Sequence, residues 1–435
     1  MRQRPGGTRF DVSALERCVG DPELFARDVW GRRAIVHRAG AEHVAVEETR
    51  GAAPEAGFAD LLTLDAVDHL LSSTALRTPA FRLVRDGSPL PAAAYTKASS
   101  ISSVPMTGLA DPVRIFREFD AGATIVLQGA HRFWPPIARF CRELELALGH
   151  PCQANAYITP PGSKGLALHE DSHDVFVLQA FGRKHWHVRE TPAERAAEGG
   201  EPIDRTLEPG DVLYLPKGTP HAARTQDVLS GHLTIGIQAT TWRSLVDDVA
   251  GRLKREASLG LDERLPAGYH RDRGALTAAM RDRLEDLARY VDKLDPAELA
   301  DAVVDRFLTT RPPLVRGQLV DGSRVHEVAD ATPLRRREAT VCELRPRGEQ
   351  LDVLLGDRGL RMPSWVKPAM RILAALPAGG RIRGLDLAAD LDAESRLVLL
   401  RRLVREGYLE FASDAGGSEG EHAGERGLAS RDGAR

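Results

Sequence analysis

The chain has 435 residues, which is too long for one ordinary hydrophobic core and predicts two or three domains. Its hydrophobic content of 42%, charged content of 28% and formal net charge of -3 give no general attraction to nucleic acid or acidic membranes. No run approaches the roughly 20 apolar residues that span a bilayer, and no signal peptide is recognisable, so we expect a cytoplasmic protein without a membrane partner. The four cysteines form no C-x-x-C pair, which argues against a zinc knuckle or a disulfide framework.

Residues 1–122 are expected to be a helical lead-in that belongs to the catalytic domain. Apolar residues recur at helical spacing within this stretch, at Leu61, Leu62, Leu64, Val67, Leu70 and Leu71.

The pattern changes over residues 123–242, where short apolar runs are separated by Gly, Pro and Asp, as in ATIVLQG, NAYITPPG, DVFVLQAFG and GHLTIGIQ. Many short strands with such punctuation are typical of a β-sandwich or barrel. One helix is expected among them, over residues 135–149, with Pro near its start and Gly near its end.

A helical period returns over residues 243–320. Four apolar residues recur there at steps of three and four, as in a packed seam: Leu284, Leu287, Val291 and Leu294. Such a stripe predicts either a dimer interface or packing within its own domain, and the sequence leaves both open.

Residues 321–412 give short strands, three helices and a closing strand YLEF, an order that suggests a winged helix. The third helix is expected to begin after Asp392, a favoured N-cap, and to stop at Gly407. Residues 413–435 have no periodicity and are expected to form a disordered tail.

Three residues in the strand-rich part have the chemistry of a metal site. A mononuclear non-haem iron needs two imidazoles and one carboxylate on one face, with positions left open. His169 and Asp171 are two residues apart, so in an extended segment they point the same way. His221 follows the turn PGD and the strand VLYLP, and is the expected third ligand from a distant strand.

A second His-x-Asp match, His270 and Asp272, is a built-in control for this motif. It lies in a polar, Arg-rich stretch that is expected to be helical, with no strand context and no later His preceded by PGD, so we do not expect it to bind iron. His173 shares the face of His169 and Asp171 if the strand continues, which makes it a rival ligand; second-layer hydrogen bonding or substrate contact is the preferred role.

The run NAYITPPGSKGLALHEDSHDVFVLQAFGRKHWHV, followed by LEPGDVLYLPKGTPHAA, resembles the JmjC-domain ribosomal oxygenases and their bacterial cupin-like relatives. The resemblance implies an α+β protein: a double-stranded β-helix (JmjC/cupin jelly roll) with a helical lead-in, a helical dimerisation region and a C-terminal winged helix. It extends over about residues 20–412.

By this resemblance His169, Asp171 and His221 are iron ligands, and Lys184 binds the distal carboxylate of 2-oxoglutarate. A buried dicarboxylate needs a fixed cation at its far end, which is consistent with a Lys between apolar runs. Asn155 is expected close to the cosubstrate. Tyr157 shares its face and is expected either to line the substrate pocket or to belong to the core.

The sequence departs from the family at Gly236, where some members carry a Ser that assists cosubstrate binding. One contact to the cosubstrate is therefore missing or supplied by another group.

The resemblance implies an Fe(II)- and 2-oxoglutarate-dependent dioxygenase, with O2 as second cosubstrate, that hydroxylates an amino-acid side chain, most readily on a ribosomal protein. A homodimer is expected. The alternative substrate is a peptide or amino acid of a biosynthetic pathway. A cupin isomerase with a His-x-His motif is disfavoured, because Asp171 stands where that motif has His.

An alternative of another class is a DNA-binding regulator with a cupin sensor domain. Acidic and basic residues are nearly balanced over residues 340–412, which is a poor footprint for phosphate. Nucleic acid is therefore not an expected partner. No GxSxG motif or P-loop points to another chemistry.

Overall fold

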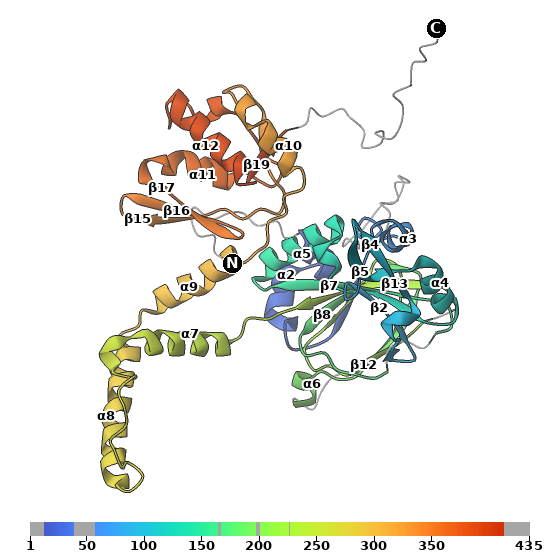
Figure 1. Ribbon diagram of the computed structural model, residues 1–435, viewed down its shortest axis with the longest axis horizontal. Coiled ribbons are helices and arrows are strands. Elements are labelled where there is room, and N and C mark those ends of the chain that lie inside the picture. The colour runs from blue at the N-terminus through green and yellow to red at the C-terminus, as the bar shows by residue number, and fades with distance from the viewer. Residues whose placement is uncertain (1–12, 39–56, 164–166, 197–200, 226, 413–435) are drawn as a thin grey trace.

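The computed structural model describes residues 13–38, 57–163, 167–196, 201–225 and 227–412. The tail predicted over residues 413–435 lies outside the described residues. In chain order the described part forms a β-rich body, a helical arm and a C-terminal unit (Figure 1). None of its helices is both long and apolar enough to cross a membrane.

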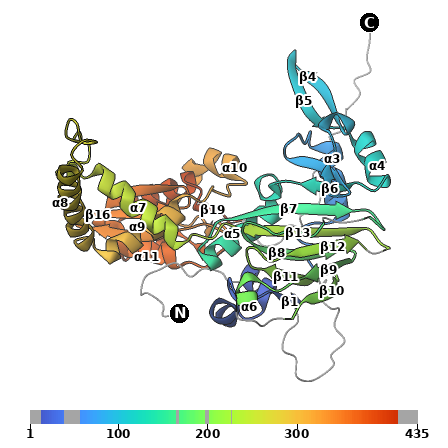
Figure 2. The same cartoon turned by 90° about the horizontal axis from the view of Figure 1, so that it is seen from below.

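Two antiparallel sheets make up the β-rich body (Figure 2). The larger has the strand order β1-β11-β8-β13-β7-β6-β2-β3 and the smaller the order β10-β9-β12. The bounds of these strands are β1 (Ile35–Arg38), β2 (Phe81–Arg85), β3 (Ser88–Pro89), β6 (Thr124–Leu127), β7 (Cys152–Thr159), β8 (Asp174–Phe181), β9 (Lys184–Val188), β10 (Ile203–Leu207), β11 (Asp211–Leu215), β12 (His221–Thr225) and β13 (Ser230–Ile237). The strands predicted over residues 123–242 are thus confirmed.

Alternation along the strands gives the body its two apolar layers. On β8, Val175 and Val177 point toward the smaller sheet and pack with Trp186 and Val188 of β9. Phe176 and its neighbours of the other parity belong to the main core. Helices α1 (Ser13–Val19), α3 (Leu64–Ser73) and α5 (Pro135–Leu148) contribute apolar side chains to that core.

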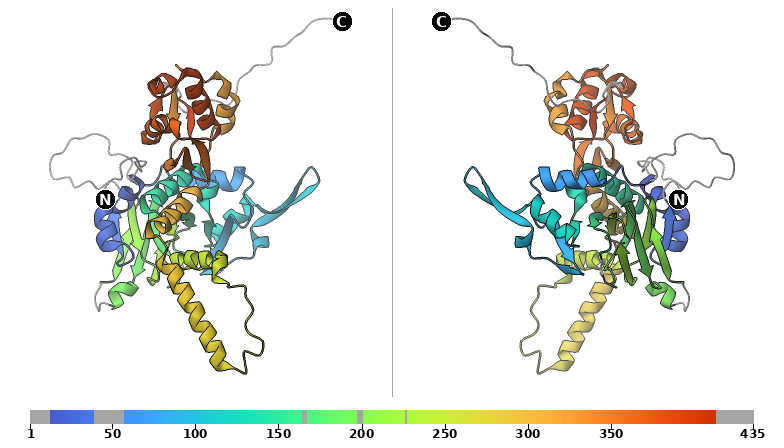
Figure 3. Two further views of the ribbon diagram at one scale, coloured as in Figure 1. Left: turned by 90° about the vertical axis from the view of Figure 1, so that its left-hand side faces the viewer. Right: turned by 90° about the vertical axis from the view of Figure 1, so that its right-hand side faces the viewer.

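The expectation of a purely helical lead-in is wrong. Its helices are α1, α2 (Pro22–Leu24), the π-helix η1 (Phe25–Val29), α3, the short η2 (Ala92–Ala94) and α4 (Pro112–Asp120). However, β1 pairs with β11, and β2 pairs with β6, so both edges of the larger sheet come from this region. Strands β4 (Thr96–Ile101) and β5 (Val104–Ala110) form a separate hairpin that projects from the body (Figures 2 and 3). These strands are short and have no long apolar run, so the helical spacing of apolar residues elsewhere in the region does not reveal them.

Three further helices belong to the body: the short η3 (Ala130–Arg132), α5 at the predicted position, and the short α6 (Pro192–Ala196). The arm that follows consists of α7 (Trp242–Arg255), η4 (Ala257–Leu259), α8 (Arg273–Asp292) and α9 (Pro296–Thr309). Helix α8 extends away from the rest of the molecule in both Figures 1 and 3.

The C-terminal unit has a hydrophobic core of its own. Its elements are α10 (Gln318–Ser323), η5 (Val325–Glu327), β14 (Leu334–Arg336), β15 (Glu343–Arg347), β16 (Gln350–Leu355), β17 (Arg358–Pro363), η6 (Ser364–Val366), α11 (Lys367–Ala375), β18 (Arg381–Ile382), η7 (Gly384–Leu387), α12 (Ala393–Arg405) and β19 (Leu409–Phe411). The carboxylate of Asp392 accepts a hydrogen bond from the Ser395 N–H at the start of α12, as expected of an N-cap. Gly407, beyond its end, has a φ of 75°.

Candidate metal centre

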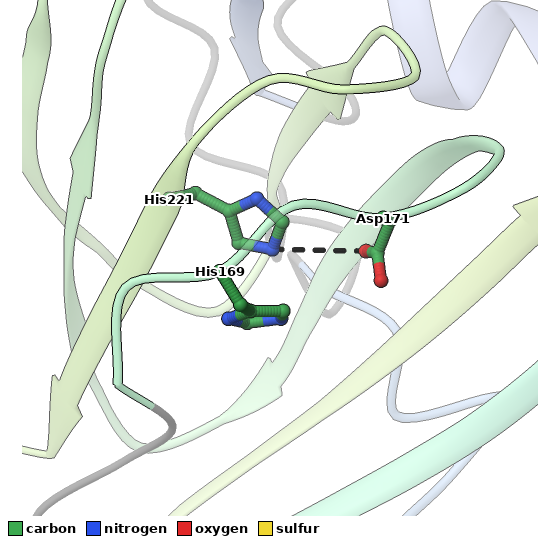
Figure 4. Close-up of side chains that lie close together, drawn as sticks. All are labelled: His169, Asp171 and His221. Carbon is green, nitrogen blue, oxygen red and sulfur yellow. Dashed lines mark ion pairs between the residues drawn. The ribbon is translucent and has the colours of Figure 1, made fainter.

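The side chains of His169, Asp171 and His221 lie close together in the β-rich body (Figure 4). Each offers one ligand atom, and these atoms lie within 4.8 Å of one another. The Nε2 atom of His221 is 3.7 Å from Oδ2 of Asp171. In the described part of the chain this is the only group of three or more His, Cys, Asp or Glu residues with that geometry.

The backbone brings the two histidines together directly. The N–H of His169 donates to the carbonyl of His221 at 3.0 Å, and the N–H of His221 donates back at 2.9 Å. The predicted extended strand through His169 and Asp171 is wrong, because β8 begins only at Asp174 and His169 forms an isolated bridge. Asp171 is held instead by its carbonyl, which accepts from the N–H of Gly218 at 2.9 Å.

The hydrogen bonds of both imidazoles fix which nitrogen faces the site. Nδ1 of His169 lies 2.8 Å from the carbonyl of Ala167, and Nδ1 of His221 lies 2.9 Å from that of Thr219. A carbonyl can only accept, so Nδ1 carries the proton and Nε2 is free to bind a metal. Burial lowers the pKa of His221, which favours the neutral form that ligation requires.

His173 is not part of the cluster. Its ring lies against Gly236, where an added Cβ would be 2.3 Å from Nε2 of His173. The family's Ser is therefore excluded at position 236 unless the imidazole moves. His173 nevertheless lines the same cavity as the three clustered residues.

A cavity of about 100 Å³ extends from the cluster into the space between the sheets. Lys184 lies deep in it and is only 3% exposed. Its ammonium donates to Oγ1 of Thr159 at 3.3 Å, and Thr159 is in turn 3.2 Å from Oγ1 of Thr124. Burial lowers the pKa of Lys184 to about 8. The inward position predicted for this Lys is therefore what the structure has.

Asn155 and Tyr157 of β7 also line the cavity. The Asn155 Oδ1 atom accepts from the N–H of Gly129 at 2.9 Å, which fixes the orientation of the amide. Tyr157 stacks on His232 with ring centroids 5.0 Å apart and planes at 4°. Burial raises the pKa of Tyr157, so its hydroxyl stays protonated and available as a donor.

Residues 127–245 match the family described as the JmjC domain. This part of the chain is a JmjC domain. The chain is similar to ribosomal oxygenase 1 of Rattus norvegicus, with 30% identity over 308 residues that cover 66% of this chain and 48% of the relative. It is also similar to ribosomal oxygenase 2 of Bos taurus, with 31% identity over 269 residues, 56% of this chain and 58% of the relative. The chain thus spans about half the length of the curated relatives it matches.

Solved structures of YcfD, a ribosomal oxygenase of Escherichia coli, have the same fold. For one of them the TM-score is 0.50 at 18% identity, and the alignment covers 90% of this chain and 98% of the YcfD chain. Another, in complex with cobalt and 2-oxoglutarate, has a TM-score of 0.50 at 19% identity and covers 91% and 99%. The JmjC/cupin-type architecture predicted from sequence is confirmed.

The control motif lies outside the JmjC domain and has an ordinary structural role. The carboxylate of Asp272 accepts a hydrogen bond from the N–H of Ala275 and caps the start of α8, and His270 is exposed. The His-x-Asp motif thus provides a helix N-cap at Asp272, whereas at His169 and Asp171 it provides two members of the ligand cluster.

Sequence reasoning missed several residues that line the cavity of the JmjC domain. His232 is buried beside Tyr157, and Thr124 and Thr159 surround the Lys184 ammonium. Arg82 reaches the cavity from β2, far outside the recognised motif. The inward parity of Thr159 with Asn155 and Tyr157 was readable from sequence, whereas the pairing of β2 with β6 was not.

Proposed function

We propose that this protein is an Fe(II)- and 2-oxoglutarate-dependent oxygenase that hydroxylates an amino-acid side chain of a ribosomal protein. One observation carries the proposal: the His169, Asp171 and His221 cluster and the Lys184 ammonium line a single cavity. Two imidazoles with one carboxylate are the donor set of non-haem Fe(II) oxygenases. The relatives named as ribosomal oxygenases support the substrate class.

The three clustered residues would hold the iron, which together with 2-oxoglutarate and O2 supplies an oxidant that converts a C–H bond to C–OH. Lys184 would bind the distal carboxylate of 2-oxoglutarate, with the hydroxyls of Thr159 and Thr124 beside it. The oriented amide of Asn155 would donate to the cosubstrate nearer the iron. The rings of Tyr157, His232 and Trp186 line the same cavity as the ligand cluster and Lys184, and they would help to exclude water from it.

Hydroxylation is preferred to demethylation as the outcome. A relative from Dictyostelium discoideum, 29% identical over 253 residues, is named a bifunctional lysine-specific demethylase and histidyl-hydroxylase. Both outcomes begin with the same oxidation of a C–H bond. They separate in the product, because a stable added oxygen marks hydroxylation and released formaldehyde marks demethylation.

The chemistry is tested by 2-oxoglutarate turnover, measured as succinate formation. His169→Ala and Asp171→Ala should abolish turnover, whereas His270→Ala, in the control motif, should leave it unchanged. Equal turnover in all three would overturn the iron site. The substrate is tested by mass spectrometry of ribosomal proteins from cells with and without the gene; if none differs by one oxygen, the ribosomal assignment fails and the tailoring of a small peptide replaces it.

We also infer that the chain forms a homodimer through α8. Two of the four stripe residues are exposed in the described chain, Leu284 at 65% and Val291 at 45%, whereas Leu287 and Leu294 are partly buried. Isolated stripes of this length on a projecting helix are typical of an interface.

We propose that residues 321–412 form a winged helix that does not read DNA. Three arginines of α12 already have partners within the unit. Arg396 pairs with Asp330, Arg402 pairs with Glu406, and Arg401 donates to the carbonyl of Val328. Few cations are left on this helix for phosphate.

A further inference from the structure

Arg82 is a second cation in the wall of the cavity. Strand register places it on the same rung as Val126 of β6, which is paired in turn with Tyr157 of β7. Paired residues on neighbouring strands point to the same face of a sheet. Arg82, Val126 and Tyr157 accordingly all line the cavity, with the small Val126 leaving room for the guanidinium to reach across.

The guanidinium of Arg82 has spare hydrogen-bonding capacity. It lies beside the hydroxyl of Tyr157, and its Nε is buried without a hydrogen-bond partner. Among the described residues Arg82 forms no ion pair, whereas Arg85, three positions along the same strand and on its other face, pairs with Glu118 at 2.6 Å. Arg82 is therefore poised for an acceptor that the described chain does not supply.

The charges that line the cavity identify that acceptor. Asp171 is the only carboxylate among the lining residues, and Arg82 and Lys184 are the only Lys or Arg side chains among them. Iron, Asp171, dianionic 2-oxoglutarate and protonated Lys184 together carry no net charge. Arg82 adds one positive charge that nothing in this set balances. The residue is half-buried and its Nε atom is fully buried, so an acceptor with a negative charge would be favourable there.

We propose that Arg82 binds a carboxylate of the substrate, so that the substrate presents an acidic group near the carbon that is oxidised. This inference rests on the proposed function and narrows its substrate class. A cationic side chain would be repelled from the Arg82 side of the cavity. The carboxylate comes either from an Asp or Glu within a protein segment or from the free α-carboxylate of a small peptide or amino acid.

Binding of defined small probes tests the proposal without knowledge of the substrate. The full chain is loaded with Mn(II) and 2-oxoglutarate without oxygen, and the paramagnetic relaxation of probe methyl protons is measured. The probes are N-acetyl-aspartate N-methylamide, its asparagine counterpart, and N-acetyl-alanine, which has a free α-carboxylate. A carboxylate probe should bind about tenfold more tightly than the asparagine probe, and whichever carboxylate probe binds identifies the source.

Three variants separate the explanations. Arg82→Gln should remove the preference for a carboxylate probe, because it removes the charged hydrogen-bond donor. The affinity for 2-oxoglutarate should change by no more than about twofold, since 2-oxoglutarate pairs with Lys184. Arg82→Glu should favour N-acetyl-lysine N-methylamide instead. Arg85→Gln, the same change on the opposite face of β2, should behave as the wild type.

The proposal is overturned if neither carboxylate probe binds more tightly than the asparagine probe, or if the preference for a carboxylate is unchanged in Arg82→Gln. So does a loss of 2-oxoglutarate affinity in Arg82→Gln as large as that in Lys184→Gln, because Arg82 would then bind the cosubstrate. Failure of the proposed function looks different: Mn(II) would not bind at all, and His169→Ala would not change the relaxation of water protons.

Discussion

The side chain of Lys184 is buried, and burial lowers the pKa of its ammonium group. Its ordinary pKa of 10.5 is lowered to about 8 by burial alone. In the unfolded chain the side chain regains its ordinary pKa, so between pH 8 and 10.5 the unfolded state binds more protons. The contribution of Lys184 to the free energy of unfolding of the ligand-free protein should therefore increase as pH rises from 8 to 10.5, which stabilises the folded state.

Binding of 2-oxoglutarate should show the opposite trend. Only the protonated Lys184 pairs with a carboxylate, so the Kd for 2-oxoglutarate should be constant well below pH 8 and rise by up to about tenfold per pH unit above it. Calorimetry with Mn(II)-loaded protein from pH 6.5 to 9.5 measures this. Lys184→Arg keeps its charge and should flatten the profile; a flat profile in the wild type would contradict the assignment.

Gly236 and His173 form a coupled pair, because a Cβ at position 236 would overlap the imidazole. His173 is partly exposed, so we expect its imidazole to move aside and Gly236→Ser to cost little stability, about 1 kcal/mol or less. It should displace His173 and alter the KM for 2-oxoglutarate.

The double variant Gly236→Ser, His173→Ala removes the overlap. If the two residues act as a pair, its KM should lie closer to that of His173→Ala than the sum of the single effects predicts. Strict additivity of the two single changes would show that the contact has no functional consequence.

At the scale of elements, the helices and strands that could be predicted are those specified by residues adjacent in the sequence. Strands β6, β7, β8, β11 and β13 contain apolar runs separated by Gly and Pro, and the cap of α12 at Asp392 lies within four adjacent residues. Strands β1 and β2 are short, and their positions are decided by partner strands that lie more than a hundred residues away for β1 and about forty residues away for β2. The converging side chains of His169 and Asp171 were predicted for the wrong reason, since a backbone bridge to His221 replaces the strand.

Helix α8 offers a test at this scale. Leu284→Glu puts a charge in the middle of the exposed stripe and should convert a dimer to a monomer, measured by light scattering during gel filtration. Asp282→Ser, on a different exposed face of the same helix, should leave the mass unchanged. A monomeric wild type would refute the interface.

At the scale of the whole molecule, a buried charge cluster joins the JmjC domain to the C-terminal unit. Glu145 of α5 pairs with Arg142 at 2.9 Å and with Arg311 at 2.8 Å, and all three side chains are less than a tenth exposed. Arg142 also donates to the carbonyl of Pro312, and the N–H of Arg311 bonds the carbonyl of Gly356.

Neutralising Glu145, the central carboxylate of this cluster, should lower the stability of the protein. Glu145→Gln leaves two buried guanidinium groups without a counter-charge, and the free energy of unfolding should fall by about 3–5 kcal/mol. Urea denaturation measures it. Glu338→Gln, which breaks the exposed pair with Arg139 at 2.9 Å across the same two parts, is the control and should cost under about 1 kcal/mol. Similar losses in both variants would mean that burial does not matter here.

The same Glu145 carboxylate accepts a hydrogen bond from the N–H of Cys152, the first residue of β7, at 3.0 Å. Strand β7 carries Asn155, Tyr157 and Thr159, so one acidic side chain anchors both the C-terminal unit and the strand that shapes the cavity. A chain cut short before Arg311 would leave this carboxylate half neutralised at the root of that strand. We therefore expect the shape of the cavity to depend partly on Arg311, which does not touch it, so that the C-terminal unit supports strand β7 through the Glu145 carboxylate.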